Sequence, residues 1–371
     1  MIGKFASSFT LAAYRQTMAS PRTNTPETLQ PWLLPHEKTI LLTHGATDLL
    51  ALAQRRGVAS HRLLSGTRVF ESDLHKPLAR ISHLDWLQII HNCQNHLPSA
   101  EIPCLLGASL LQNSYISLGQ LLQTAPNLAV ALRHLLFFRQ QLTSAVMPQL
   151  YRQQNEMVLE FIPVLPMAQC QHFFIVTLCS FLLTLIKQQL HQTSAITLEL
   201  QHAARKPNVH HDLSSVLSWQ LGAEVMYPAQ RDCLRIPLSL WTAPFQHACA
   251  AKFSVAKRNC RQMNRILLRR RSLIEQIYRL QKRQLPDVLQ LNTAAEHLHL
   301  PAVQLQRWLK TQHSSLSKIT DQVRHDLTRK CLTQPDFSNR RMADRLGYSD
   351  EHNFRRAFKR WTGALPSILR R

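Results

Sequence analysis

Near the end of the chain, residues 337–363 read FSNRRMADRLGYSDEHNFRRAFKRWTG, a pattern of two short helices separated by a glycine. A first helix fits residues 339–346, and Gly347 can adopt the positive φ that a sharp turn requires. Three apolar residues of this helix are spaced to face inward: Met342, Ala343 and Leu346. Helix, tight turn and second helix form a helix-turn-helix motif, in which the second helix enters the major groove of DNA.

The second helix of this segment has two faces of opposite character. Ser349 is a suitable N-cap, and the acidic residues Asp350 and Glu351 suit the positive end of a helix. An apolar stripe at helical spacing consists of Phe354, Ala357, Phe358 and Trp361. The opposite, cationic face consists of His352, Arg355, Arg356 and Lys359. We expect the stripe to anchor the helix, while the arginines and the lysine contact bases and phosphates.

A fainter copy of the pattern lies upstream in LNTAAEHLHLPAVQLQRWLKTQ. The inward residues of its two helices are Ala294, Ala295, Leu298, Leu305, Trp308 and Leu309. The turn contains His299 in place of glycine, and Pro301 would occupy the first helical position. The outward face of its second helix consists of Val303, Gln306, Arg307 and Lys310. An amphipathic helix over residues 319–332 would connect the two motifs and place them on successive major-groove segments, about 34 Å apart.

Positive charge is concentrated in the last third of the chain. Residues 252–371 contain 26 Lys and Arg against 9 Asp and Glu, whereas residues 1–251 contain 18 against 13. Such a field favours a polyanionic partner, either nucleic acid or an anionic membrane surface. A basic surface kept only for solubility is the alternative interpretation.

The rest of the chain predicts a mixed α+β domain with more helix than strand, over residues 36–250. EMVLEFIPV and AITLELQH alternate like strands, and several other segments have helical spacing. The longest apolar run, residues 173–186, is short of the roughly 20 residues that cross a bilayer, so it predicts a buried helix. Residues 1–35 predict a flexible arm, residues 251–271 a basic linker helix, and residues 272–371 an all-α domain.

Cysteine usage and the N-terminal sequence predict a cytoplasmic protein. The eight cysteines are scattered without CxxC pairs, which indicates reduced thiols. The chain does not start with an apolar segment of the signal-peptide type.

The last hundred residues resemble the DNA-binding domain of the AraC/XylS family of bacterial transcription regulators. The likeness rests on DQVRHDLTRKCL and on the signature ADRLGYSDEHNFRRAFKRWTGALPS. It implies a sequence-specific regulator of transcription, more commonly an activator than a repressor, that binds double-stranded operator DNA and is not an enzyme. The chain departs from the family pattern at His299, Val303 and Leu369.

The resemblance also implies roles for individual residues. Base-reading positions fall on Val303, Gln306, Arg307, Glu351, His352 and Arg356. Phosphate contacts are expected from Lys310, Arg355 and Lys359. RNA polymerase and a second copy of the chain are further partners, and no membrane partner is expected.

The amino-terminal part is similar to the effector domain of one branch of that family, labelled arabinose-binding, to which ornithine-utilisation regulators belong. LLALAQRRGVASHRLLSG and LGAEVMYPAQRDCLRIPLSLWTAPF carry this likeness, which implies a small-molecule effector of unknown identity. Trp86, Phe137, Phe138 and residues 173–186 are candidates for lining a ligand cavity, although residues at helical spacing are more often ordinary core.

Other chemistries find little support in the sequence. Its 19 histidines, including His210–His211 and His297/His299, have no partner carboxylate or cysteine at ligand spacing, so no metal or cofactor is expected. No GxGxxG, Walker or GxSxG motif occurs. Two alternatives remain open. One is a non-specific architectural or membrane-surface protein that uses charge alone, and the other is a DNA-repair alkyl-transfer enzyme, although no cysteine lies in a PCHR-type motif.

Overall fold

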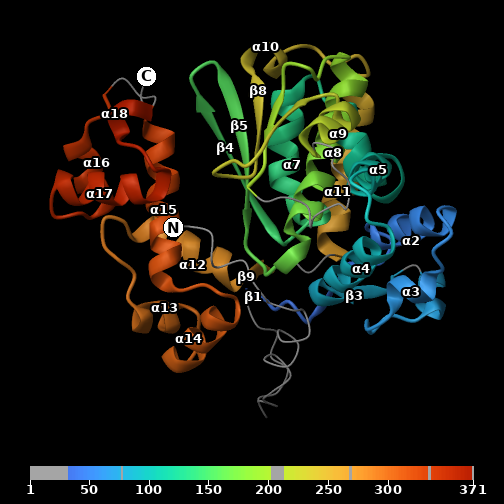
Figure 1. Cartoon of the computed structure of the whole chain (residues 1–371), viewed down its shortest axis with the longest axis horizontal. Coiled ribbons are helices and arrows are strands. Elements are labelled where there is room, and N and C mark those ends of the chain that lie inside the picture. Colours follow the sequence, from blue (N-terminus) through green and yellow to red (C-terminus); the bar gives the residue numbers. More distant parts are fainter. Residues whose placement is uncertain (1–31, 77, 202–212, 267–269, 333–335, 370–371) are drawn as a thin grey trace.

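The computed structural model describes residues 32–76, 78–201, 213–266, 270–332 and 336–369. A mixed α/β domain at the amino-terminal side is followed by a helical domain at the carboxyl-terminal side, which confirms the predicted fold class (Figure 1). The flexible arm predicted for residues 1–35 lies outside the described residues up to position 31.

A five-stranded sheet, with strand order β4-β5-β8-β6-β7, forms the centre of the first domain. Its strands are β4 (Val146–Gln153), β5 (Glu156–Pro163), β8 (Cys233–Pro237), β6 (Thr197–Glu199) and β7 (Glu224–Met226). All neighbours are antiparallel except β6 and β7, which are parallel. β5 and β6 agree with the alternating sequence patterns, but β4 was not predicted.

Helices surround α8 (Gln171–Leu190), the apolar helix predicted to be buried. By composition and length α8 could cross a membrane, but 78% of its apolar window is buried inside the domain, so it is a core helix. The other helices of this domain are α2 (Ala46–Arg55), α3 (Ser60–Leu64), α4 (His83–His96), α5 (Glu101–Ser109), α6 (Ile116–Gln123), α7 (Leu128–Leu142), α9 (Leu213–Leu221), α10 (Leu238–Trp241) and α11 (Ala250–Ile266). A small hairpin joins β2 (Lys38–Leu41) to β3 (Arg80–Ser82) in antiparallel register.

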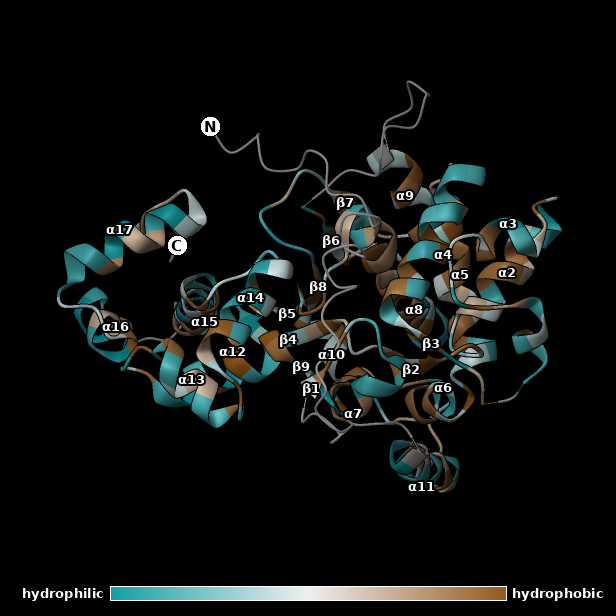
Figure 2. Cartoon of the chain, turned by 90° about the horizontal axis from the view of Figure 1, so that it is seen from below, coloured by the Kyte–Doolittle hydropathy of each residue, from teal (hydrophilic) through white to brown (hydrophobic). Residues whose placement is uncertain are grey.

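The helical domain contains seven helices within the described residues. They are α12 (Leu273–Gln284), α13 (Leu291–His297), α14 (Ala302–Thr311), α15 (Leu316–Cys331), α16 (Asn339–Leu346), α17 (Glu351–Thr362) and α18 (Pro366–Leu369). Hydrophilic residues cover much of α13, α16 and α17 (Figure 2). Two separate apolar cores hold the domain together, one under α13 and α14 and the other under α16 and α17. Each helix-turn-helix motif therefore has a core of its own.

A two-residue parallel ladder joins the two domains. β1 (Trp32–Leu33) pairs with β9 (Arg271–Ser272), immediately before α12. Trp32 is 2% exposed and belongs to the core under α13 and α14. The flexible arm therefore cannot include residues 32–35, because β1 gains backbone partners and buries an indole ring.

Helix α11 also differs from its prediction as a linker helix over residues 251–271. Among the described residues it ends at Ile266, and Arg271 already belongs to β9. Ala256 and Cys260 of α11 are buried in the core of the first domain, where the helix packs along α6 and α7. Although it is basic, α11 is thus an integral part of the first domain.

Candidate nucleic-acid interface and ligand cavity

The second helix-turn-helix motif consists of α16, the turn at Gly347 and α17. α16 covers the predicted residues, and Gly347 has a φ of 71°. A Cβ atom at this position would lie 1.9 Å from the carbonyl oxygen of Pro286, so only glycine fits this turn. Phe354 and Phe358 are fully buried beneath α17, as the stripe predicts.

The N-cap of α17 is Asp350, and the prediction of Ser349 was wrong. The Asp350 carboxylate accepts a hydrogen bond of 2.7 Å from the backbone N–H of Asn353, and the Ser349 hydroxyl donates to Asp350 instead. This hydrogen bond lowers the pKa of Asp350. A carboxylate is favoured here because it also meets the positive end of the helix dipole.

Three of the five predicted DNA-contacting side chains of α17 lie on the face opposite its apolar stripe, and the other two flank the stripe. His352, Arg356 and Lys359 are exposed, while Glu351 and Arg355 are half-buried. Arg360 on the same helix forms an ion pair of 2.9 Å with Asp321 of α15.

The first motif, α13 and α14, has the same architecture with different turn chemistry. His299 adopts a φ of 52°, the left-handed conformation that glycine usually provides, and Pro301 is the N-cap of α14 rather than its first helical residue. Leu305 and Leu309 are buried, and Trp308 packs edge-on against Trp32 at 6.0 Å between ring centroids. The predicted outward residues are exposed: Val303, Gln306, Arg307 and Lys310.

Helix α15 connects the motifs and contacts the turn of the second motif directly. Arg324 donates hydrogen bonds to the carbonyl oxygens of Leu346 (2.9 Å) and Gly347 (3.2 Å), and its guanidinium lies 4.3 Å from the centroid of the Tyr348 ring. The orientation of α17 is therefore fixed relative to α15. Sequence reasoning missed Arg324, because its partners are backbone atoms that no side-chain pattern encodes.

His325 of α15 is a half-buried neutral histidine against this core. Its ring lies 5.6 Å from that of Trp361, and burial, followed by the charges of Arg329 and Arg231, lowers its pKa to about 3. Between about pH 3 and pH 6.5 the unfolded chain therefore binds a proton on this ring, and the folded chain does not. The free energy of unfolding consequently decreases as the pH falls below 6.5.

Replacing His325 with phenylalanine should flatten this pH dependence and keep a ring against Trp361. One proton bound only by the unfolded chain changes the free energy of unfolding by up to about 1.4 kcal/mol per pH unit, and the substitution removes this contribution. Urea unfolding of both proteins between about pH 7 and about pH 5 measures the two slopes. Coincident slopes would show that His325 is not responsible.

A buried polar network joins the two domains beside β4 and β5, which lie between the helical domain and α7 in Figure 1. The Arg329 guanidinium of α15 donates to both carboxylate oxygens of Glu160 on β5, at 2.7 and 2.6 Å, and to Asp326 at 2.8 Å. The three side chains are only 10%, 6% and 2% exposed. Burial raises the pKa of Asp326, and Arg329 opposes that rise.

Strand β4 extends this network towards α12. Gln149 donates a hydrogen bond of 2.8 Å to Asp326, which also accepts one of 2.6 Å from the Tyr278 hydroxyl. At two further points, Arg139 of α7 pairs with Glu275 of α12, and Gln230 donates a 2.7 Å bond to the carbonyl oxygen of Thr362 at the end of α17. The first domain thus contacts α12, α15 and the end of α17.

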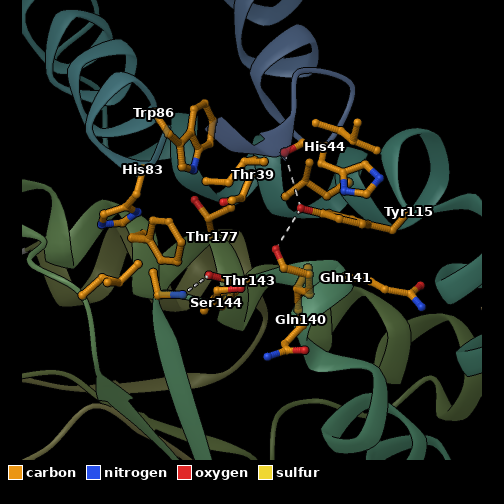
Figure 3. Close-up of a pocket in the computed structure, with 18 of the residues that line it drawn as sticks. Thr39, His44, His83, Trp86, Tyr115, Gln140, Gln141, Thr143, Ser144 and Thr177 are labelled. Carbon is orange, nitrogen blue, oxygen red and sulfur yellow. Dashed lines mark hydrogen bonds between the residues drawn. The ribbon is translucent and has the colours of Figure 1, made fainter. Parts of the chain in front are cut away.

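The first domain also contains a cavity of about 60 Å³ between α4, α7 and α8. His83 and Trp86 approach it from α4, while His44 and Tyr115 lie together on another side (Figure 3). Gln140, Thr143 and Ser144 line it where α7 passes into β4. Among the predicted candidates, Trp86 and part of residues 173–186 line the cavity, whereas Phe138 is core and Phe137 is 69% exposed.

Both cavity histidines are neutral at neutral pH. Burial, together with the charge of Arg80, lowers the pKa of His44 to about 4. Burial also lowers the pKa of His83 to about 4, partly offset by the hydrogen bond to the Pro166 carbonyl oxygen at 2.8 Å. The cavity wall therefore presents hydrogen-bonding groups and apolar surface rather than charge.

The structure contains two turn-linked helix pairs with exposed polar faces, and one helix joins the pairs. They are attached to a domain with an internal cavity. This combination defines a DNA-binding regulator with a ligand-binding domain. Comparisons with known families agree. Residues 57–245 match the arabinose-binding domain of AraC transcription regulators, N-terminal, and residues 294–371 match a helix-turn-helix domain. The chain belongs to the AraC family of transcription regulators, which are not enzymes.

Two relatives align over most of the chain, and a third aligns over about a quarter of it. It is 26% identical over 329 residues to the ornithine utilization regulator of Pseudomonas aeruginosa, with 88% of this chain and 94% of that protein covered. The transcriptional regulator CdpR from Pseudomonas aeruginosa aligns over 97% of this chain and 96% of its own, at 17% identity and a TM-score of 0.32. The C-terminal domain of AraT from Geobacillus stearothermophilus covers 26% of this chain and 83% of its own, at 25% identity and a TM-score of 0.24. Neither TM-score is high enough to bear on the arrangement of this chain.

Proposed function

We propose that this regulator is a ligand-responsive activator that recognises two successive major-groove segments, one with α14 and one with α17. Base contacts come from Val303, Gln306, Arg307, Glu351, His352 and Arg356, and phosphate contacts from Lys310, Arg355 and Lys359. The observation that supports this assignment best is the exposure of polar side chains on the faces of α14 and α17 opposite their buried stripes. Such faces provide the donors and acceptors that read base edges.

Footprinting on a cognate operator tests the two-segment assignment. Protection should fall in two patches about one helical turn apart, because major grooves repeat every 34–36 Å on one face of DNA. Equal binding to all sequences at about 150 mM salt would support the non-specific architectural alternative and overturn this proposal.

Arg356→Ala and Lys359→Ala form a matched pair on α17. Arg356→Ala should lose a bidentate contact with guanine. This loss should weaken specific binding by about 1–3 kcal/mol and reduce the selectivity for the base at that one position. Loss of a phosphate contact at Lys359 should weaken binding to all sequences and reduce the salt-dependence slope by about one unit. Titrations of operator and mutated operator at several salt concentrations separate the two effects. An Arg356→Ala variant with the original preference would contradict its assignment.

Ligand control requires an effector that prefers one arrangement of the domains over another, typically by about 1–3 kcal/mol. The cavity wall is connected to the contacts between the domains. Gln140 donates to the carbonyl oxygen of Arg270, immediately before β9, and Ala145 precedes β4 directly. A change in cavity shape thus reaches the residues that hold α12 and α15.

The remaining assignments follow from this role. We propose that the first domain extends through α11 and that the DNA-binding domain covers residues 272–371. We also propose a cytoplasmic location, and contacts with RNA polymerase and a second copy of the chain. A promoter fused to a reporter gene tests activation, since loss of transcription on deletion of the regulator supports it and a gain indicates repression. Sedimentation of the full chain with and without operator DNA tests the dimer.

A further inference from the structure

Three arginines surround one carboxylate where β9 passes into α12, between the two domains (Figure 1). Oε1 of Glu275 forms an ion pair with Arg139 of α7. The same oxygen lies 2.9 Å from Nε of Arg279 and 3.5 Å from Nε of Arg271. Within the described residues, no other carboxylate forms an ion pair with any of the three arginines. Three positive charges therefore share one negative charge.

Further positive charge lies close to this cluster. Arg283 is exposed on α12, one helical turn beyond Arg279. The pKa of Arg271 is lowered, first by partial burial and then by the neighbouring guanidiniums, that of Arg283 among them, although Glu275 opposes this change. The neighbouring positive charges therefore outweigh the single carboxylate.

Two of the guanidiniums can reach a ligand. Arg271 and Arg279 contact Glu275 through Nε, and their side chains are 45% and 41% exposed. No group of the described part of the chain accepts a hydrogen bond from the Nη atoms of either arginine. Because both Nε atoms lie within 3.5 Å of one oxygen, the two guanidiniums are neighbours. Adjacent guanidiniums with unused N–H groups match an anion with several acceptor oxygens.

We infer that Arg271 and Arg279 bind a phosphate group, with Arg283 adding to the attraction. Guanidiniums donate paired hydrogen bonds to phosphate oxygens, which fixes the orientation of the anion as well as its position. Three arginines around one carboxylate leave an excess of two positive charges. This excess favours a dianion, such as inorganic phosphate or a phosphomonoester, over the singly charged phosphodiester of DNA.

The cluster connects such a ligand to the contact between the domains. Arg139 belongs to the first domain and Glu275 to the helical domain, and Arg139 also donates a hydrogen bond of 3.1 Å to the carbonyl oxygen of Val146 in β4. A bound dianion reduces the repulsion among the guanidiniums, so it should favour the arrangement in which the domains are in contact. This regulatory meaning rests on the proposed function, whereas the binding itself does not.

Isothermal titration calorimetry of the full chain with inorganic phosphate tests the binding at about pH 8, where phosphate is a dianion. Sodium acetate at the same ionic strength provides a singly charged oxyanion for comparison. We expect phosphate to saturate in the millimolar range or below, and acetate to bind roughly tenfold more weakly. Equal binding of the two anions, or no saturable binding of phosphate, would overturn the inference.

Three variants locate the site on the basic surface. Arg279→Gln removes one guanidinium and should weaken phosphate binding by roughly tenfold or more. Arg283 forms no hydrogen bond or ion pair within the described residues, so Arg283→Gln should keep the fold and weaken phosphate binding about two- to threefold. Arg62→Gln, at an exposed position on α3, is the matched control and should leave it unchanged. Equal affinities in the three variants would exclude this site, and Arg283→Gln decides the matter even if Arg279→Gln does not fold.

A DNA duplex without operator sequence distinguishes the two sources of a phosphate group. Unchanged duplex affinity in Arg279→Gln, together with weakened phosphate binding, supports a free phosphate compound as the ligand. Weaker duplex binding in Arg279→Gln but not in Arg62→Gln would overturn the assignment to a dianion and indicate a contact with the DNA backbone.

Sequence-specific binding to operator DNA is measured separately on the same preparations. Its absence from the unaltered chain would defeat the proposed function and leave the phosphate result intact. Retained operator binding together with failed phosphate binding would defeat only the phosphate site.

Discussion

Replacing Arg329 with alanine is expected to lower the free energy of unfolding by about 3–5 kcal/mol, because it leaves buried carboxylates without their cation. Glu160 and Asp326 are 6% and 2% exposed, and both accept hydrogen bonds from Arg329. Chemical denaturation followed by tryptophan fluorescence measures the loss. Since the network joins the two domains, we expect the variant to unfold in two steps rather than one.

Arg341→Ala is the matched control for this prediction. Arg341 also forms an ion pair, with Asp336 at 2.6 Å, but the two side chains are 66% and 67% exposed. Pairs screened by water contribute about 1 kcal/mol or less. Equal losses in the two variants would mean that the buried network does not stabilise the contact between the domains.

Gly347→Ala is the second substitution with a large expected effect. An alanine at a φ of 71° is strained, and its Cβ would lie 1.9 Å from the Pro286 carbonyl oxygen, a backbone atom that cannot swing away. Left-handed strain of about 1–2 kcal/mol and displaced packing of about 1–3 kcal/mol together predict a loss of about 2–5 kcal/mol. Urea unfolding measures the loss, and footprinting should show weaker protection of the segment bound by α17.

The chain contains a suitable control for the clash itself. Gly57 also has a positive φ, 81°, but a Cβ there would meet no atom within 4 Å. Gly57→Ala should therefore cost only the backbone strain of about 1–2 kcal/mol. A Gly347→Ala variant no less stable than Gly57→Ala would exclude the contact with Pro286 as a constraint on the turn.

The helix-turn-helix motifs were predictable because their information is local. In the second motif, the stripe, the turn and the length of α16 all lie within residues 337–363, and the structure confirms each of them. Only the cap was assigned one residue too early, because Ser349 and Asp350 are both good N-cap residues in sequence. The assignment of base and phosphate contacts is still a prediction.

Strand β4 was missed because neither of its faces is purely apolar. Gln149 is buried and Leu150 is only half-buried, so the alternation that marks a half-exposed strand is absent. The reason lies in the helical domain, since Met147 packs into its core and Gln149 contacts Asp326, 177 residues away. Periodicity within one segment cannot report a surface that a distant segment covers. The Arg329–Glu160 pair escaped prediction for the same reason.

Strand β1 makes the helical domain dependent on a part of the chain that lies more than two hundred residues upstream. Trp32 and Leu34 complete the core beneath α13 and α14 alongside Met147 and Val164 of the other domain. The DNA-binding domain is therefore not a self-contained module, although it is continuous in sequence. A chimera that joins residues 272–371 to a foreign sensor would expose Trp308 where Trp32 normally covers it. Transplanting this domain intact requires the foreign sensor to supply a short strand with an indole at the same place.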